Sequence, residues 1–459
     1  MYDYDLIVIG AGPGGSAAAL RAGKLGLRCA VVEAREPGGT CVNRGCVSTK
    51  TLLHSSQLYH DAANGAAAGI HMEGLRADLP EIFQNKRRVA QTLSQGLETM
   101  LKAAKIPLLR GRARIEAPHR LRLGSEELSA EHILIATGAA PVRLPLPGMD
   151  LPGVLTSEDL LEGLDRLPKS LVVIGGGVIG IEFACFFSDL GVSVTILEGL
   201  DRLLPMLDRE LGQNLGLILK KQGVQVVPNA LVEGCEQAEG GLTVRYTVKG
   251  KPGEALGELV LVAVGRRAAL DGLFAPGLGP ETDGSILKVN DRFETSIPSV
   301  YAIGDAASQV QLAHMASAQG TAFAELLCGV RPVTDLSLVP SCVYCRPEIA
   351  VVGLTEAEAK ARGIPVKVGK CVMGGNARVV IDEPGRSFMK VLARADTKEL
   401  VGAQLMCPHA ADSISQLSAA IANRRTPEEL LRPMRPHPSF EESLTEALLD
   451  LQRKLDAAL

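Results

Sequence analysis

The chain has 459 residues, of which 46% are hydrophobic, so it is long enough for two to four domains with buried cores. Its 48 basic and 52 acidic residues leave a formal net charge of -4, which argues against a nucleic acid or an anionic membrane surface as the main partner. The sequence has no apolar run of about eighteen residues or more and no basic flank before its first apolar stretch, so we predict a cytoplasmic protein without a membrane-spanning helix.

The first predicted element is an apolar strand that runs into a glycine-rich turn, "YDLIVIGAGPGG", at residues 4–15. An alanine-rich helix follows, and a second strand ends at Glu33. In such a pattern Gly10 allows a tight turn, Gly12 lets a pyrophosphate approach the backbone, and Gly15 lets the helix pack on the strand. The helix N-terminus faces the phosphates, and the acid about twenty residues on accepts from ribose hydroxyls. The segment therefore predicts a dinucleotide-binding fold.

The next segment, "GGTCVNRGCVSTK" at residues 38–50, holds Cys41 and Cys46 five positions apart. In an ideal helix five residues rise roughly 7.5 Å and turn about 140°, whereas a disulfide needs Cα atoms within about 7 Å. A bonded pair therefore excludes a regular helix, and Gly45 supplies the freedom to distort it. Persistent disulfides are rare in a reducing compartment, so the pair indicates a redox-active site rather than two inert buried thiols.

The glycine pattern returns 165 residues later in "LVVIGGGVIGIEFACFFSDLGVSVTILE", at residues 171–198. Its three glycines are Gly175, Gly177 and Gly180. Two strand-flanked copies, each with its acid, predict that the chain holds two dinucleotides at once. A carboxylate at Glu198 accepts from a ribose 2′-hydroxyl and repels a 2′-phosphate, which favours NAD over NADP, and the nearby Arg202 weakens this preference slightly.

Strand and helix patterns alternate up to residue 330, which implies open α/β sheets. The pattern then changes to strand-like runs over residues 341–407, followed by helical stretches at 410–425 and 440–459, and we interpret this part as a separate α+β domain. Cys342 and Cys345 form a C-x-x-C whose side chains point to opposite faces of a strand, so we expect packing residues. No cysteines or histidines cluster with metal-ligand spacing, and we predict no metal.

Taken in order, the motifs resemble those of the pyridine nucleotide–disulfide oxidoreductases. The segment around Cys41 and Cys46 is similar to the redox-active signature of that family, and "GAGPGG", "ATG", "GGGVIGIE", "VGR" and "YAIGDAA" follow its order over nearly the whole chain. The closing "RPHPSFEES" resembles the H-P-x-x-x-E segment of the dihydrolipoamide dehydrogenase branch and gives His437 and Glu442. "LAHMASAQG" and "VPSCVYCRPEIAVVGLTE" also resemble that branch.

This resemblance implies an α/β fold with two Rossmann-like dinucleotide-binding domains, one for FAD and one for NAD, and a C-terminal α+β dimerisation domain. The implied FAD-binding domain comprises residues 1–145 and 270–335, the NAD-binding domain residues 146–269, and the dimerisation domain residues 336–459. The resemblance also implies a homodimer whose active site is shared between the subunits.

The resemblance further implies a two-electron relay from a dithiol through FAD to NAD⁺. Cys41 exchanges with the substrate, Cys46 faces the flavin, and Lys50 lies by the flavin ring, paired with Glu182. His437 of the second subunit takes the proton of the substrate thiol, and Glu442 orients the imidazole. The implied FAD contacts are Gly10, Gly12, Gly15, Glu33, Thr40, Lys50, Thr137, Gly138, Asp305 and His314. The implied NAD contacts are Gly175, Gly177, Gly180, Glu182, Glu198 and Gly265.

The resulting hypothesis is an NAD-dependent dihydrolipoamide dehydrogenase that serves a lipoyl-bearing protein of a 2-oxo acid, acetoin or glycine-cleavage complex. One alternative is an NAD(P)H-dependent reductase of another disulfide, a quinone or a metal ion, and another is a non-catalytic flavoprotein. Three departures from the family pattern are Ser48 for a proline, Gln319 for an acid and Arg435 for a histidine. None of them removes a catalytic group, but we expect each to shift the rate or the redox poise.

Overall fold

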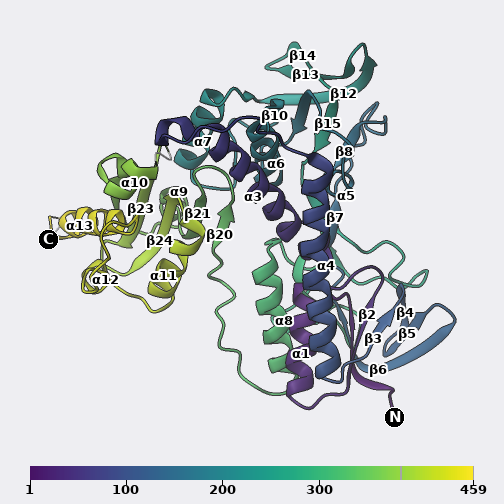
Figure 1. Ribbon diagram of the computed structural model, residues 1–459. Helices are drawn as coiled ribbons and strands as arrows, with labels where there is room; N and C mark the ends of the chain where they lie inside the picture. Colours follow the sequence, from purple (N-terminus) through teal and green to yellow (C-terminus); the bar gives the residue numbers. More distant parts are fainter. Residues whose placement is uncertain (383–384, 458–459) are drawn as a thin grey trace.

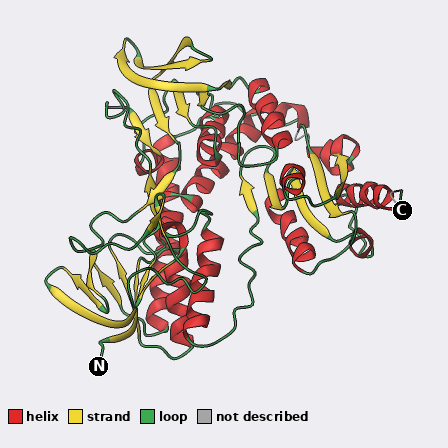
Figure 2. Cartoon of the chain, turned by 180° about the vertical axis from the view of Figure 1, so that it is seen from behind, coloured by secondary structure: helices red, strands yellow, loops and turns green. Residues whose placement is uncertain are grey.

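In the computed structural model, residues 1–382 and 385–457 are described. The chain is organised around three larger sheets, two of them mainly parallel and the third antiparallel. Figures 1 and 2 show these sheets as three separate groups, with the C-terminal group to one side. An extended segment, residues 328–340, connects the C-terminal group to the rest.

The first sheet contains the N-terminal strand in its interior. Its parallel part has the order β3-β2-β1-β6, with β19 beside β6, and the antiparallel strands β5 and β4 extend it beyond β6. Residues 6–9 of β1 are all apolar, without the alternation of a half-exposed strand, because this part of the strand is buried on both faces. The strands are β1 (Tyr4–Ile9), β2 (Cys29–Glu33), β3 (Leu108–Arg110), β4 (Ala113–Ala117), β5 (Arg120–Leu123), β6 (Glu126–Ile135) and β19 (Val300–Ala302).

Helices α1 (Pro13–Lys24), α4 (Leu79–Ala103) and α8 (Ala313–Leu327) lie side by side against this sheet (Figure 1). Helices α1 and α8 cross closely, since a Cβ on Gly320 would lie 2.2 Å from the carbonyl oxygen of Gly14. The cysteine segment forms α2 (Gly39–Arg44) and α3 (Cys46–Ala63), which are separated by Gly45. The short helix η2 (Gly304–Ala306) follows β19.

The second sheet is parallel, with the order β11-β10-β9-β15-β8. Its strands are β8 (Val154–Thr156), β9 (Ser170–Ile174), β10 (Ser193–Glu198), β11 (Gln225–Pro228) and β15 (Leu259–Val262). Its helices are α5 (Ser157–Glu162), α6 (Val178–Asp189) and α7 (Arg209–Lys221). An antiparallel meander of β12 (Ala230–Ala238), β13 (Gly241–Val248) and β14 (Lys251–Gly257) lies at the top of Figure 1. The sequence analysis did not predict this meander.

The short strands β7 (Ala139–Pro141) and β16 (Arg266–Ala268) pair antiparallel at the two points where the chain passes between the first and second sheets. A second small pair, β17 (Thr282–Asp283) with β18 (Ile286–Leu287), follows before β19. The second crossing returns the chain to the first sheet, because β19 hydrogen-bonds to β6. The first sheet is therefore built from both ends of the N-terminal two thirds of the chain.

The C-terminal part contains an antiparallel sheet of order β20-β21-β24-β23-β22. Its strands are β20 (Ser341–Val343), β21 (Ile349–Gly353), β22 (Val366–Val372), β23 (Phe388–Arg394) and β24 (Leu400–Met406). Its helices are α9 (Glu356–Ala361), α10 (Ala377–Asp382), α11 (Ala410–Ala422), α12 (Pro427–Leu431) and α13 (Glu442–Asp456). Residues 458–459 of the expected last helix lie outside the described residues. These elements confirm the predicted fold class, and none of the described helices is long and apolar enough to cross a bilayer.

Candidate active site and nucleotide-binding cavity

The two glycine-rich turns have the same backbone geometry. Gly10 and Gly175 both have a φ of 109°, in the left-handed region that favours glycine. A Cβ on Gly10 would lie 2.4 Å from the carbonyl oxygen of Ala136, and one on Gly175 would lie 2.5 Å from that of Ala263. Each turn therefore needs glycine at its first position.

The other glycines divide into a packing position and an open position. A Cβ on Gly15 would lie 1.9 Å from the carbonyl oxygen of Gly10, and the corresponding distance from Gly180 to Gly175 is 2.0 Å. Gly15 and Gly180 do not line the cavity described below, and each allows its helix to pack closely on the first glycine of its turn. Around Gly12 and Gly177, in contrast, the nearest atom to a Cβ is 4.0 Å away.

The acidic residues at the ends of β2 and β10, Glu33 and Glu198, form equivalent hydrogen bonds in the two nucleotide folds. Glu33 accepts hydrogen bonds from the backbone N–H of Ala11 and of Arg35, both at 2.7 Å. Glu198 accepts from the backbone N–H of Gly176 at 2.6 Å and of Leu200 at 2.7 Å. Each carboxylate is thus fixed beside its glycine turn, and both acids line the cavity.

One cavity of about 2050 Å³ runs past both glycine turns. It is roughly twice the upper end of the range of about 300–1,000 Å³ that single small-molecule pockets occupy, so it has room for two dinucleotides. The expected cofactor contacts Thr40, Thr137, Gly138, Gly265, Asp305 and His314 line it too. The buried hydroxyl of Thr137 has no hydrogen-bond partner among the described residues, and Gly12 leaves backbone open to a ligand. These features fit FAD beside the first turn.

Cys41 and Cys46 both line this cavity as free thiols. Gly45, with a φ of -154° and a ψ of -118°, breaks the helix between them, as the disulfide geometry requires. A hydrogen bond from the Cys41 thiol lowers the pKa of Cys46 to about 7, and the Lys50 ammonium acts in the same direction. Cys46 is also the first residue of α3, where the helix dipole favours a thiolate. The same hydrogen bond, together with burial, raises the pKa of the Cys41 thiol.

Lys50 of α3 and Glu182 of α6 form an ion pair at the cavity wall. The Lys50 Nζ donates to both carboxylate oxygens of Glu182 at 2.8 Å. The backbone N–H of Tyr344 donates to Glu182 Oε1 at 3.2 Å. Glu182 is 3% exposed and thus has its charge compensated inside the protein, whereas Lys50 keeps part of its surface open to the cavity.

His437 and Glu442 form the expected pair, since His437 Nδ1 lies 2.9 Å from Glu442 Oε1. A backbone hydrogen bond from Ser439, followed by the bond to His437, lowers the pKa of Glu442. Neither residue lines the cavity of its own chain, and the His437 side chain is 72% exposed. The structure therefore does not bring His437 together with Cys41 within one subunit.

Two of the three residues that depart from the family pattern, Ser48 and Gln319, form hydrogen bonds to nearby backbone groups. The Ser48 oxygen lies 2.9 Å from the carbonyl oxygens of both Val42 and Asn43. Its one hydroxyl proton, donated to either oxygen or shared between them, ties α3 to α2 in a way that a proline cannot. The side-chain oxygen of Gln319 accepts from the backbone N–H of Gly304 at 2.7 Å, directly before Asp305. Gln319 thus braces η2 without adding a charge.

The third departure, Arg435, braces the loop that carries His437. Its guanidinium donates to the Thr445 hydroxyl at 3.1 Å and to the carbonyl oxygen of Leu430 at 3.3 Å. Arg202, which was expected to weaken the NAD preference, pairs with Asp201 at 2.9 Å and donates to the carbonyl oxygen of Pro205. It does not line the cavity.

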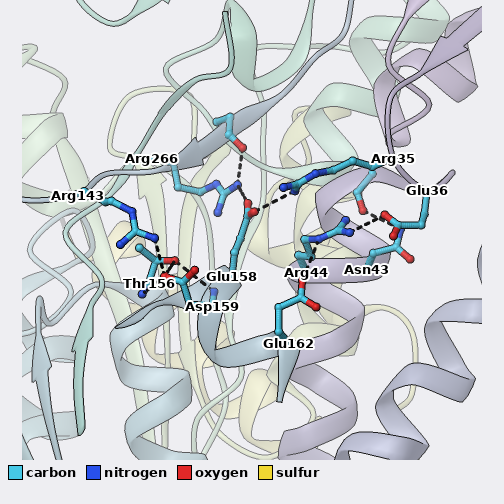
Figure 3. A network of polar contacts seen from close by, with 12 residues as sticks. Arg35, Glu36, Asn43, Arg44, Arg143, Thr156, Glu158, Asp159, Glu162 and Arg266 are labelled. Carbon is cyan, nitrogen blue, oxygen red and sulfur yellow. Dashed lines mark hydrogen bonds and ion pairs between the residues drawn. The ribbon is translucent and has the colours of Figure 1, made fainter. Parts of the chain in front are cut away.

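An ion-pair network that sequence reasoning missed joins α5 to the first nucleotide fold (Figure 3). Glu158 lies between Arg35, at 3.3 Å, and Arg266, at 3.1 Å. Burial raises the pKa of Asp305, and the charge of Arg266 opposes this. Strand β16, which contains Arg266, packs against η2, which contains Asp305. The "VGR" motif contains Arg266, but only the fold shows that this arginine lines the cavity.

Cys342 and Cys345 of the C-x-x-C were expected to be packing residues, and they differ in their surroundings. Cys345 is buried in the core, where burial raises the pKa of its thiol well above the usual value. Cys342 is half-buried against the C-terminal core, but it also lines the cavity. Among the residues that the structure describes, no three His, Cys, Asp or Glu side chains are grouped so as to hold a metal ion.

Comparison with known proteins decides the family. The pyridine nucleotide-disulphide oxidoreductase family matches residues 4–320, and the dimerisation domain of the same family matches residues 339–448. The chain belongs to the pyridine nucleotide-disulphide oxidoreductases. Membership makes it an oxidoreductase of the flavoprotein disulfide class and implies FAD and a nicotinamide dinucleotide as cofactors.

Relatives of this flavoprotein match it over its whole length. It is 35% identical to a dihydrolipoyl dehydrogenase of Bacillus subtilis, covering 97% of this chain and 98% of that protein. It is 37% identical to the dihydrolipoyl dehydrogenase of Thermus scotoductus, covering 99% and 98%. Among solved structures, the HOCl-induced flavoprotein disulfide reductase RclA from Escherichia coli matches with a TM-score of 0.87, 29% identity and coverage of 97% and 99%. That reductase has also been solved as a Cu(II) complex.

Proposed function

We propose that this flavoprotein is an NAD-dependent dihydrolipoamide dehydrogenase that oxidises the dihydrolipoamide of a lipoyl-bearing partner protein in the cytoplasm. The observation that carries the proposal is the thiol pair Cys41 and Cys46 in a cavity that both nucleotide folds share. The full-length similarity to proteins named dihydrolipoyl dehydrogenase supports this choice of substrate.

The two thiols have the unequal acidity that the exchange reaction needs. In the oxidised enzyme, a substrate thiolate attacks the Cys41 sulfur and expels Cys46 as a thiolate. A thiol with a pKa of about 7 is a good leaving group, because a low pKa speeds departure from a disulfide. The second substrate thiolate then attacks the substrate sulfur bound to Cys41, so the substrate leaves as a disulfide and both cysteines are reduced. When bound, FAD supplies the two-electron transfer from this thiol pair to the nicotinamide.

His437 has the chemistry of the base in this exchange. A neutral imidazole accepts the proton of the attacking thiol near pH 7, and Glu442 holds its Nδ1 at 2.9 Å, which leaves Nε2 to act. Because His437 does not line the cavity of its own chain, it would reach Cys41 from a second copy. The match of residues 339–448 to the dimerisation domain of the family supports a homodimer with a shared site.

The second nucleotide fold has the features of an NAD site. Glu198 is 7% exposed and is fixed by two backbone hydrogen bonds, so its negative charge stays where a 2′-phosphate would lie. Arg202 is held by Asp201 and Pro205 away from the cavity and is not available to pair with such a phosphate.

A second candidate is the reduction of another disulfide or of a metal ion at the expense of NADH. The structural match to the disulfide reductase RclA, solved with and without Cu(II), favours this candidate. In that case electrons would run from NADH towards the thiol pair. With a disulfide acceptor, His437 would protonate a released thiolate rather than deprotonate a thiol, whereas a metal ion would take up electrons without a proton.

Steady-state turnover distinguishes the two candidates. Dihydrolipoamide with NAD⁺ is compared with NADH plus lipoamide, glutathione disulfide, a quinone or Cu(II), each with NADP(H) as the control cofactor. We expect the highest kcat/KM for dihydrolipoamide and NAD⁺, and loss of that activity in Cys41→Ser. A higher kcat/KM for Cu(II) or another disulfide would favour the second candidate.

A further inference from the structure

Three parts of the chain meet in a seam beside the thiol pair. These parts are α3 of the first nucleotide fold, α6 of the second, and residues 343–347 at the start of the C-terminal domain. At one level of the seam, Glu182 binds Lys50 and the backbone N–H of Tyr344. Two helical turns further along α6, Asp189 accepts from the Ser56 hydroxyl at 3.2 Å and pairs with Arg346. The backbone of Tyr344 is thus fixed on both sides.

The aromatic ring of Tyr344 has a separate contact in this seam. The Lys50 Nζ lies over the ring, 4.6 Å from its centroid. Cations within about 6 Å of an aromatic centroid are attracted by the negative face of the ring. The Lys50 ammonium is therefore held between the Glu182 carboxylate and the ring of Tyr344, while its side chain remains 31% exposed towards the cavity.

The Tyr344 ring stays uncharged near neutral pH, so its negative face remains available to Lys50. Burial, followed by the neighbouring Cys342 and Glu348, raises the pKa of the Tyr344 phenol to about 12. The phenol therefore stays neutral, and its ring face does not change with the protonation of the nearby thiols. The ring itself lines the cavity, as Lys50 and Cys46 do.

We propose that Tyr344 is a positioning residue that holds the Lys50 ammonium where it stabilises the Cys46 thiolate. The groups that act on Cys46 are Cys41 on α2, Lys50 on its own helix and Glu182 on α6. Cys41 and Lys50 favour the thiolate, and Glu182 opposes it. Without the ring, only Glu182 holds the Lys50 ammonium, so the ammonium is less firmly positioned and its effect on Cys46 falls. The inference deepens the proposed function by adding a residue that acts through Lys50 on the thiol that would face the flavin.

The test follows the ionisation of Cys46 in holoenzyme that carries Cys41→Ser, so that Cys46 remains a thiol. The rate of Cys46 alkylation by iodoacetamide is measured between about pH 5.5 and 9.5, with the labelled peptide quantified by mass spectrometry. Tyr344→Leu removes the ring and is expected to raise the midpoint by about 0.5 to 1 pKa unit. Tyr344→Phe keeps the ring and is expected to leave the midpoint in place.

Two further variants separate positioning from folding. Tyr344→Met also lacks an aromatic face, but its unbranched, flexible side chain adapts better to the space left by the ring. It is expected to shift the midpoint as Tyr344→Leu does, so the test stands if the leucine variant does not fold. Ser56→Ala loosens the seam at Asp189 and is expected to lower the melting temperature with no shift of the midpoint.

An unchanged midpoint in folded Tyr344→Leu or Tyr344→Met would overturn the inference. A shift in Tyr344→Phe as large as that in Tyr344→Leu would overturn it too, because the hydroxyl would then be the active group. The alkylation readout involves no substrate, so absence of dihydrolipoamide turnover would count against the proposed function without affecting this result.

Discussion

Replacing Cys41 with serine tests the assignment of the two thiols. Cys46 then has no disulfide partner in the cavity pair, and the serine hydroxyl can still donate a hydrogen bond to it. With a pKa of about 7 instead of the usual 9.0, Cys46 is about half ionised at pH 7, whereas an ordinary thiol is about 1% ionised. Because the pKa is lowered, the thiolate persists above pH 7 and is lost as the pH falls through that value.

The assay is the long-wavelength charge-transfer absorbance between this thiolate and oxidised flavin in the holoenzyme, measured without any reductant. We expect the band in Cys41→Ser with a midpoint near pH 7, and no band in Cys46→Ser. Cys41→Ala removes the hydrogen-bond donor and is expected to move the midpoint towards 9. A band in Cys46→Ser instead, or a Cys41→Ser midpoint near 9, would refute the assignment.

Three further results are expected. Glu198→Arg should remove the repulsion of a 2′-phosphate and shift the ratio of kcat/KM from NAD towards NADP, and equal use of both cofactors by the wild type would contradict this reading. Gly180→Ala should destabilise the protein by about 3 kcal/mol or more through the clash with Gly175, while Gly96→Ala on exposed helix surface should stabilise it by up to about 1 kcal/mol, both measured by denaturant unfolding. Mixing Cys41→Ser subunits with His437→Gln subunits should restore activity, and no recovery despite subunit exchange would count against a shared site.

The parts of the fold that follow local rules were predictable from the sequence. The strand before each glycine turn, the helix after it and the acid at the end of the next strand all lie where the 165-residue repeat predicts them. These positions are predictable because local geometry requires glycine at each of them. Gly10 has a φ of 109°, and a Cβ on Gly15 would clash with the carbonyl oxygen of Gly10. The exact domain boundaries stay a prediction.

Contacts between distant segments were much harder to predict. The ring of Tyr344 meets Lys50 across 294 residues of sequence, and Arg266 meets Glu158 across 108. Nothing local in "VYC" or "VGR" specifies these partners, because they depend on how the sheets pack. The structure also shows the close approach behind the third glycine of each turn, since a Cβ on Gly15 or Gly180 would lie about 2 Å from the carbonyl oxygen of the first glycine.

What the residues that depart from the family pattern do in the protein could also be seen only in the structure. Ser48 in place of a proline was expected to shift the rate or the redox poise. In the structure its hydroxyl also bonds α3 to the carbonyl oxygens at the end of α2. The pairing of His437 with Glu442 was expected from the family resemblance of one short segment, and the structure shows it. Their distance from the cavity of their own chain was expected only from the family resemblance.

Rapid mixing of the oxidised holoenzyme with dihydrolipoamide tests the central claim most directly. We expect dihydrolipoamide to reduce the Cys41–Cys46 pair, the charge-transfer band to appear, and added NAD⁺ then to yield one NADH per active site. Failure of dihydrolipoamide to reduce the enzyme, while NADH with Cu(II) or another disulfide supports rapid turnover, would contradict it.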